Sequence, residues 1–262
     1  MNQQQANGLS RQVNALRYAV QFLTRFPVGN IENDPELAGK SVPWFPLVGL
    51  LIGVTLSLFA WCLVEVLAMP SLLAASLIVF LWVVVTGALH LDGLADCADA
   101  WMGSHSRERM LEIMQDTHTG VGAIVMLLLI LLIKVSAVDV LLQYKMWEVL
   151  ILTPILGRIS MALVLVSFPY VRPDGLGDAM KSNILSQYVL IPVGVLSLVL
   201  VLFDFTLLLV AGIATLVAIS LIYWQIMRKI GGATGDVFGA TVEITEAVFL
   251  VCFAAFFLAQ AR

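Results

Sequence analysis

The stretch "LLAASLIVFLWVVVTGALHLDGLADCADAW" at residues 72–101 determines the fold class of this chain. Its first eighteen residues, Leu72 to Leu89, carry no charge and are about as long as a helix that crosses a bilayer. Three aspartates, Asp92, Asp96 and Asp99, follow directly. The uncharged run predicts a membrane span, and carboxylates at the end of a span predict a functional site.

The composition extends this prediction to the whole chain. Of 262 residues, 60% are hydrophobic and 12% are charged, and the mean hydropathy is +0.97; soluble domains average about 25% charged residues. We predict an all-α polytopic membrane protein with about seven transmembrane helices, which form a single membrane-embedded catalytic domain over residues 1–262. The predicted spans lie near residues 43–66, 72–90, 120–143, 147–168, 186–203, 205–226 and 238–260.

The N-terminal segment predicts a helix of a different kind. Residues 9–26 repeat apolar side chains at helical spacing, with polar residues on the other faces, which indicates an amphipathic interfacial helix on the membrane surface. No cleavable signal peptide is expected, because the first long apolar run begins only after residue 40. The three cysteines are isolated, so neither a disulfide framework nor a CxxC site is indicated.

The distribution of lysine and arginine predicts the orientation. With a cytoplasmic N-terminus and seven spans, ten basic residues lie inside and only Lys145 and Arg262 lie outside. This bias predicts a multi-pass protein of the bacterial cytoplasmic (inner) membrane whose polar stretches 90–119, 169–187 and 228–237 face the cytoplasm. The net charge of −4 argues against nucleic acid as a partner.

The three aspartates share one face of the predicted helix. At 3.6 residues per turn, Asp92, Asp96 and Asp99 point the same way within about 10 Å of axial length. Their mutual repulsion and their oxygen-only donors favour a hard divalent ion, Mg²⁺ before Ca²⁺ or Mn²⁺. The alternative is a solvated helix end. His90 lies near the opposite face, where helix packing is as good an explanation as a catalytic role.

A second acidic group begins the last predicted span, in "GGATGDVFGATVEITEAVFL" at residues 231–250. Glu243 and Glu246 lie one turn apart inside an apolar helix, and Asp236 lies at the polar N-terminal end of that helix. Carboxylates within a membrane span are candidates for a functional site. Thr234 or Asp236 has a second explanation as the cap of the helix.

The basic residues near these carboxylates have two explanations each. Arg158, inside a predicted span, either neutralises one carboxylate or holds a substrate phosphate. Lys134 is expected to reach toward the outer interface and is given no role. Arg107 and Arg109, in a polar loop that also contains Asp116, suit phosphate oxygens, although a positive-inside loop explains them almost as well.

Six stretches of the chain together resemble the cobalamin synthase (adenosylcobinamide-GDP ribazoletransferase) family, over nearly the whole length. They are "FLTRFPV" at 22–28, "FPLVGLLIG" at 45–53, "GALHLDGLADCADAW" at 87–101, "RERMLEIMQDTHTGVG" at 107–122, "DGLGD" at 174–178 and "GGATGDVFGATVEITE" at 231–246. His118 stands where the family more often has a basic residue, so His118 is left out of the expected site.

The resemblance implies a reaction and its participants. Adenosylcobinamide-GDP and α-ribazole, or its 5′-phosphate, would give adenosylcobalamin, or its 5′-phosphate, and GMP, with Mg²⁺ as cofactor and the lipid bilayer as surroundings. A homo-oligomer stays open. Together with the residue chemistry, the resemblance implies Asp92, Asp96 and Asp99 as metal ligands; Asp116 and Glu243 as further catalytic residues; and Arg25, His90, Arg107, Arg109, Arg158, Thr234, Asp236 and Glu246 as substrate-binding residues.

Two alternatives stay open at the level of sequence. A lipid-synthesising CDP-alcohol phosphatidyltransferase would carry "DG..AR", whereas here Asp96 follows Ala95. An ion-coupled transporter would use Glu243, Glu246, Arg158 and Lys134 as an intramembrane relay. Most ionisable residues, however, gather on the predicted cytoplasmic side, which favours the transferase.

Overall fold

The computed structural model describes residues 3–32, 34–172, 175–184 and 205–260. Within these residues the regular secondary structure is helical, apart from one isolated β-bridge between Tyr170 and Ala233. This confirms the predicted all-α class. The helices are α1 (Gln3–Leu23), α2 (Pro35–Ser41), α3 (Phe45–Trp61), α4 (Ser71–Thr86), α5 (Leu89–Gly103), α6 (Arg107–Ile113), α7 (Val121–Gln143), α8 (Trp147–Ser167), α9 (Leu176–Ser182), α11 (Phe205–Lys229) and α12 (Gly235–Gln260). A 3₁₀ turn, Val42–Trp44, joins α2 to α3, and a π-helical turn, Cys62–Val66, extends α3.

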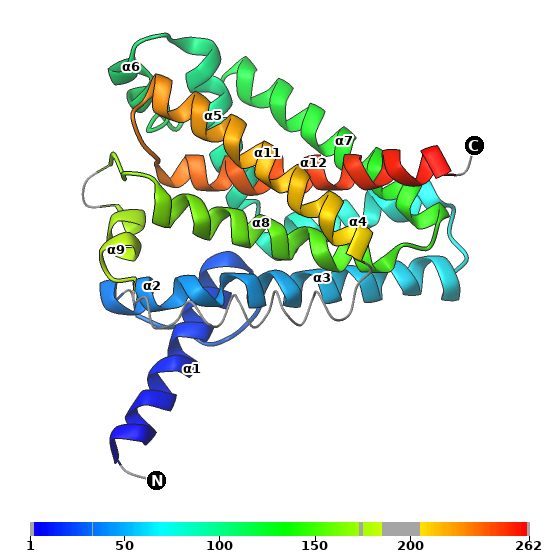
Figure 1. Ribbon diagram of the computed structural model, residues 1–262, viewed down its shortest axis with the longest axis horizontal. Helices are drawn as coiled ribbons and strands as arrows, with labels where there is room; N and C mark the ends of the chain where they lie inside the picture. The colour runs from blue at the N-terminus through cyan, green and yellow to red at the C-terminus, as the bar shows by residue number, and fades with distance from the viewer. Residues whose placement is uncertain (1–2, 33, 173–174, 185–204, 261–262) are drawn as a thin grey trace.

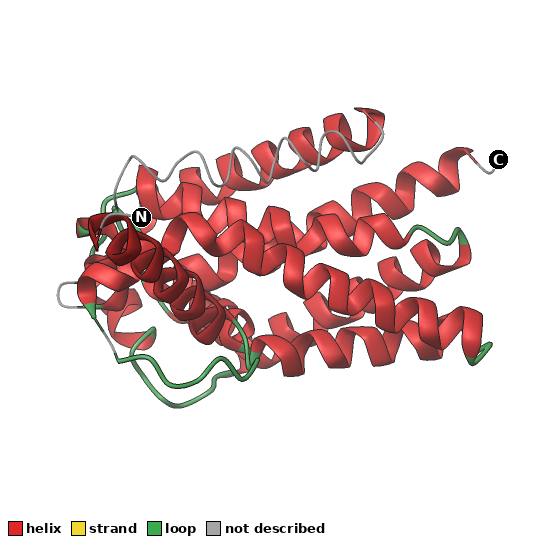
Figure 2. Cartoon of the chain, turned by 90° about the horizontal axis from the view of Figure 1, so that it is seen from below, coloured by secondary structure: helices red, strands yellow, loops and turns green. Residues whose placement is uncertain are grey.

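The longer helices form a bundle whose members run roughly along the long axis of the molecule (Figures 1 and 2). Helix α12 is central, because it packs against α5, α7, α8 and α11. Helix α3 packs along α8 on one side of the bundle, and α4 packs against α7. All three cysteines are free thiols, as their isolation in the sequence predicts.

Four described helical segments are long and apolar enough to cross a membrane: Pro35–Val66, Val121–Gln143, Trp147–Ser167 and Gly235–Ala259. Helices α4 and α5, which form a bent pair, are together also long and apolar enough to cross a membrane, which gives up to five candidate spans. The predicted span 205–226 coincides with helix α11, whereas the predicted span 186–203 lies outside the described residues. The number seven therefore stays a prediction, while the multi-pass architecture is supported.

The predicted span 72–90 is not one straight helix, which corrects the sequence-based boundary. Two consecutive residues, Gly87 (φ 62) and Ala88 (φ 58), adopt the left-handed conformation and end α4. The chain then turns by 92° into α5. A left-handed alanine is costly, so packing on both sides of the bend must hold it in place. The aspartates consequently lie on a separate arm that packs against α7 and α12.

Helix α1 begins and ends earlier than the predicted helix 9–26, and it projects from the bundle (Figure 1). Over its second half, the apolar face packs against α2 and α3, where Ala15, Tyr18, Ala19 and Leu23 are buried. Val13, in the first half, remains 49% exposed. Among the side chains of α1 that the structure describes, Val13 is therefore an uncovered apolar one for the predicted membrane surface.

The three polar stretches meet at one end of the molecule. Arg107 Nε donates to the carbonyl of Ile230 (2.8 Å), and the β-bridge joins Tyr170 to Ala233. At the opposite end, Lys145 pairs with Glu65 (2.8 Å). The structure thus brings together the segments that the basic-residue bias placed on one side of the membrane.

Candidate functional site

The site is built where α5 crosses α12. A Cβ on Gly93 would lie 2.7 Å from the carbonyl oxygen of Asp236, and one on Gly239 would lie 3.0 Å from the carbonyl oxygen of His90. The first distance is too short for a side chain and the second is tighter than most Cβ contacts, so glycine at the two positions lets the helix backbones approach closely. The crossing therefore brings the aspartates of α5 next to the start of α12.

A cavity of about 270 Å³ opens beside this crossing. Asp92 and His90 from α5, Asp236 from α12, and Tyr170 and Arg172 from the segment after α8 contribute to its lining. The guanidinium of Arg172 donates to the Asp236 carboxylate (Nη2 to Oδ2, 2.9 Å). Cationic and anionic side chains from three parts of the chain therefore converge on one space.

Thr234 and Asp236 have distinct positions at the start of α12. The Thr234 hydroxyl is buried, accepts from the Val237 N–H (3.3 Å) and donates to Asp236 Oδ2 (3.3 Å). This arrangement supports the capping explanation for Thr234. Asp236 faces the cavity, so it keeps its place among the site candidates.

Sequence reasoning missed Arg172 and Tyr170 as site residues and counted Arg172 only toward the positive-inside bias. Backbone bonds hold their segment: Val171 N–H donates to Ala233 O (3.0 Å), and Ala233 N–H donates to Pro169 O (2.8 Å). The Tyr170 ring also stacks on Phe238, with ring centroids 6.0 Å apart. The only signal in the sequence was their position just before the matching stretch "DGLGD".

The three aspartates of α5 do not act as one set. Asp92 is exposed and Asp96 half-buried, and neither has an ion pair among the described residues. Asp236, Asp92 and Asp99 all lie within range of Coulomb interaction with Asp96, as does the cation of Arg172. Asp99 instead accepts from the backbone N–H groups of Gly120 (2.6 Å) and Ala123 (2.8 Å), at the N-terminus of α7. Shared helical spacing did not predict this second partner.

No group of three or more His, Cys, Asp or Glu side chains in the described part of the chain has the geometry to hold a metal ion. Asp92 lines the cavity of Asp236 and Arg172, whereas Asp99 lines a different cavity of about 400 Å³ with Asp116. A preformed site of three aspartates is therefore not present. Asp92 and Asp236 line one cavity, and both act on the neighbouring carboxylate of Asp96 through Coulomb repulsion.

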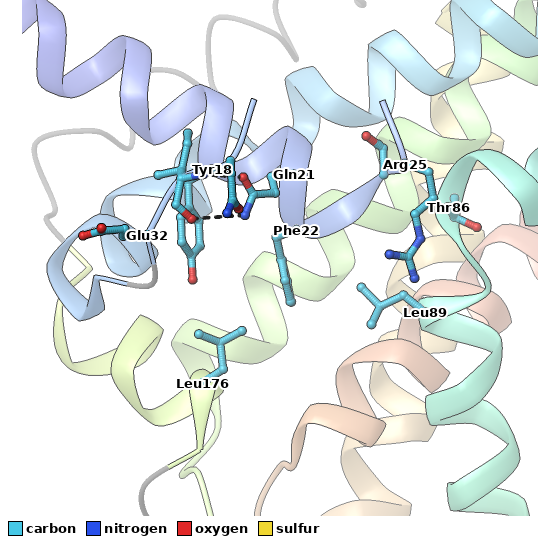
Figure 3. Close-up of a pocket in the computed structure, with 11 residues that line it drawn as sticks. Tyr18, Gln21, Phe22, Arg25, Glu32, Thr86, Leu89 and Leu176 are labelled. Carbon is cyan, nitrogen blue, oxygen red and sulfur yellow. Dashed lines mark hydrogen bonds between the residues drawn. The ribbon is translucent and has the colours of Figure 1, made fainter. Parts of the chain in front are cut away.

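A second and larger cavity, of about 520 Å³, adjoins the first, and the two share Phe22, Leu89 and Leu176 in their walls. Its lining comes from the end of α1, the segment 24–32 and the bend between α4 and α5. Figure 3 shows Arg25 and Glu32 on opposite sides of this cavity, with Phe22 between them.

Glu243 and Glu246 lie in a buried charge network rather than in either of these cavities. Lys134 of α7 donates to Glu243 and to Glu246, both at 2.6 Å, and Arg158 of α8 pairs with Glu246. The ammonium of Lys134 also lies 4.6 Å from the ring centroid of Trp82. The expectation that Lys134 reaches the outer interface is wrong, because intramembrane carboxylates on α12 stabilise its charge inside the bundle.

His90 connects this network to the first cavity. Its Nδ1 lies 3.4 Å from Arg158 Nη2. A guanidinium has only N–H donors, so Nδ1 must accept, and the proton of the neutral ring resides on Nε2. Within the described residues, buried Nε2 has no hydrogen-bond partner. His90 thus lines the cavity and keeps one buried N–H donor without a partner among the described residues.

The candidates in the polar loop after α5 have other partners. Arg109 pairs with Glu112 (2.8 Å), and both side chains are 64% exposed. Arg107 bonds the carbonyl of Ile230, at the end of α11. Asp116 is exposed and bonds His118 (2.6 Å), and these hydrogen bonds lower the pKa of Asp116. None of the three sequence candidates lines either cavity near Asp92 or Arg25.

Comparisons with known proteins place the whole chain in one family. The family model for cobalamin-5-phosphate synthase matches residues 15–254. A protein of Pseudomonas aeruginosa named adenosylcobinamide-GDP ribazoletransferase is 43% identical over 249 residues, which cover 92% of this chain and 97% of that protein. A protein of the same name from Stutzerimonas stutzeri is 41% identical over 241 residues, covering 90% and 96%.

No solved structure matches the chain. The family match spans α1 to α12, and it includes the α5–α12 crossing and both adjoining cavities. This chain belongs to the cobalamin-5-phosphate synthase family.

Proposed function

We propose that this chain transfers the cobinamide phosphate of adenosylcobinamide-GDP to α-ribazole, or to its 5′-phosphate, and releases GMP. Family membership and the names of the similar proteins support this activity. The observation that carries it is the cavity at the α5–α12 crossing, where Asp92, Asp236 and Arg172 converge. Unlike charges in one cavity are suited to a pyrophosphate and to the cation that accompanies it.

The reaction is a single phosphoryl transfer. A ribose hydroxyl of the acceptor attacks the phosphorus joined to cobinamide, and the bond from that phosphorus to the guanylyl phosphate breaks. GMP leaves with the electron pair, and the hydroxyl proton passes to a carboxylate or to water. The phosphate of GMP needs little protonation, so the protein mainly aligns the reactants and neutralises charge.

Two side chains of the first cavity are suited to bind the donor. Arg172 presents a planar guanidinium, which binds two phosphate oxygens at once. The unused Nε2–H of His90 donates to a further substrate oxygen. Arg158 and Glu246 act as positioning residues, because they hold His90 in the tautomer that keeps this donor. Glu243 completes the balance of charge around Lys134.

A magnesium ion fits the carboxylates that remain. Mg²⁺ is usually held by one or two carboxylates together with substrate phosphates and water, rather than by an all-protein cage. Asp92 and Asp96 meet this description, since neither forms an ion pair in the described structure. When bound, the ion neutralises charge on the transferring phosphoryl group. Asp99 is not needed for this site.

We place the protein in the bacterial cytoplasmic membrane with both cavities facing the cytoplasm. The excess of lysine and arginine in the polar stretches supports this orientation. The gathering of those stretches at one end of the bundle agrees with a single side of the membrane for all three. The lipid bilayer is then the partner of the exposed apolar side chains of α4, α7 and α11.

The direct test is GMP release by the purified protein in detergent, with adenosylcobinamide-GDP and α-ribazole, across a Mg²⁺ titration. Asp92→Asn and Asp96→Asn should each lower the rate by a factor of about 10² or more, because each loses an anionic metal ligand. Glu108→Gln, an exposed carboxylate change on α6, is the matched control and should keep the wild-type rate. Near-normal turnover and an unchanged Mg²⁺ response in both Asn variants would exclude this metal site.

A further inference from the structure

The second cavity contains two charged side chains, Arg25 and Glu32, to which the transfer step gives no role. At about 520 Å³ it is large enough for a nucleotide unit. It adjoins the first cavity, at the α5–α12 crossing and here called the reaction cavity, through Phe22, Leu89 and Leu176. Side-chain to backbone hydrogen bonds from α1 hold the segment 24–32 that forms its outer wall. They join Arg17 to Val28 O (2.8 Å) and Gln21 to both Ile31 N (2.9 Å) and Ile31 O (3.2 Å).

Arg25 is a positioned cation in this cavity. Its backbone N–H donates to Val85 O (2.7 Å), and its guanidinium occupies the space that a Cβ on Gly87 would fill. Among the described residues, Arg25 has no carboxylate partner. A guanidinium held beside the bend but left without a counter-ion is suited to bind an incoming phosphate.

Glu32 is the complementary group across the cavity. It lies on the opposite side from Arg25, and no cation pairs with it in the described part of the chain (Figure 3). The aromatic ring of Phe22 lies between the two charges. A carboxylate only accepts hydrogen bonds when it is ionised, so it requires a ligand edge that carries N–H donors.

We infer that this cavity binds the guanylyl end of the donor, with the phosphate on Arg25, the base against Phe22 and the base edge on Glu32. This inference rests on the proposed function for its choice of ligand. The edge of guanine presents two adjacent donors, N1–H and the N2 amino group, which match the two oxygens of Glu32. Arg25 lies on the side of the bend, next to α5, so the phosphate end points toward the reaction cavity.

The acceptor fits this cavity less well. The benzimidazole of α-ribazole has one ring nitrogen bonded to ribose and another that only accepts, so it offers Glu32 no donor. Its 5′-phosphate is a second source of phosphate for Arg25. The acceptor is therefore the competing occupant that an experiment must separate from the guanylyl group.

The binding test uses nucleotides alone with the full chain in detergent. Wild type should bind GMP more tightly than IMP, and IMP more tightly than AMP, because IMP lacks one donor and AMP lacks both. Glu32→Gln should reduce the preference for GMP over AMP about tenfold or more, whereas Arg25→Gln should weaken GMP about tenfold and leave guanosine unchanged. Arg11→Gln, an exposed change on α1, and Glu108→Gln are the matched controls.

The activity test identifies the source of the phosphate. Arg25→Gln should raise the KM for adenosylcobinamide-GDP about tenfold and leave the KM for α-ribazole 5′-phosphate unchanged. A rise for α-ribazole 5′-phosphate instead would place the acceptor in this cavity and overturn the inference. Arg25→Lys, which keeps the charge and loses the planar fork, should fall between wild type and Arg25→Gln, and thermal unfolding should confirm that all variants fold.

The two proposals fail in different ways. If GMP is released from adenosylcobinamide-GDP but neither variant changes GMP selectivity or KM, the transferase stands and the guanylyl site is excluded. If GMP binds with the stated selectivity but is never released from the donor, the nucleotide site stands and the transferase is excluded. Equal losses for GMP, AMP and guanosine in both variants would also overturn the guanylyl site.

Discussion

Two aspartates of α5 stand seven positions apart and have different partners. Asp92 has no ion pair among the described residues and lines the reaction cavity, whereas Asp99 accepts from Gly120 and Ala123 at the start of α7. The first four N–H groups of a helix have no partner within the helix, so an external carboxylate stabilises that end. Identical residues on one helix therefore have different surroundings: Asp92 is free to bind a ligand in the cavity, as we propose, whereas Asp99 stabilises the start of α7.

This difference predicts opposite responses at the two positions. Asp99→Ala leaves two N–H groups without their acceptor and should lower the free energy of unfolding by about 1–3 kcal/mol, while Mg²⁺ still raises the melting temperature. Asp92→Asn should leave the metal-free protein at least as stable as wild type, but reduce the stabilisation by Mg²⁺. Thermal unfolding in detergent across a Mg²⁺ titration measures both. If Mg²⁺ no longer raised the melting temperature of Asp99→Ala, Asp99 would be a metal ligand after all.

At the scale of elements, the α5–α12 contact places the carboxylates within reach of each other. A methyl group on Gly93 would lie 2.7 Å from the Asp236 carbonyl oxygen, which is rigid backbone. Gly93→Ala should therefore push the helices apart, cost about 1–3 kcal/mol of stability and lower the rate of GMP release. Gly212→Ala on α11 is the control, because a Cβ there meets nothing within 4 Å. Wild-type activity in Gly93→Ala would show that the close crossing is dispensable.

The charge network on α7, α8 and α12 contains two cations and two carboxylates, all buried. The transporter alternative would use the same groups as a relay, whereas the family match supports the transferase. Lys134→Met leaves a carboxylate uncompensated and should cost about 3–5 kcal/mol. The double variant Lys134→Met with Glu243→Gln restores neutrality and should lose less.

Denaturant unfolding of the single and double variants tests this balance. Lys145→Met is the control for loss of a lysine, since its pair with Glu65 is exposed and should change stability by at most about 1 kcal/mol. A double variant that is as unstable as the sum of its single changes would mean that Lys134 and Glu243 do not act as a pair.

At the scale of the whole molecule, the two ends of the bundle predict a labelling pattern. A cysteine-free chain with His105→Cys or Gln115→Cys should resist a membrane-impermeant maleimide in intact cells, because both exposed positions flank α6 at the end of the bundle that we propose faces the cytoplasm. Leu67→Cys, exposed at the other end, should be labelled. Labelling of His105→Cys from outside would reverse the orientation. Labelling of both ends from one side would contradict a membrane-spanning bundle.

The sequence alone determined the class of this protein and the residue types of its chemistry. Long uncharged runs predict membrane helices because water is absent from the bilayer core and helices satisfy their own backbone groups. Glu243, Glu246 and Arg158 stood out because charge inside such runs is costly. The motif around Asp92 and the one around Asp236 pointed to the family that the comparisons support.

Only the tertiary structure decided which of these residues act together. Helical periodicity places Asp92, Asp96 and Asp99 on one face, but it contains no information about the N-terminus of α7 that binds Asp99. The bend at Gly87, the pairing of Lys134 with Glu243, and the arrival of Arg172 beside Asp236 all depend on contacts between distant segments. Local sequence sets the helices and their charges, whereas the partner of each charge is set by the packing of one helix on another.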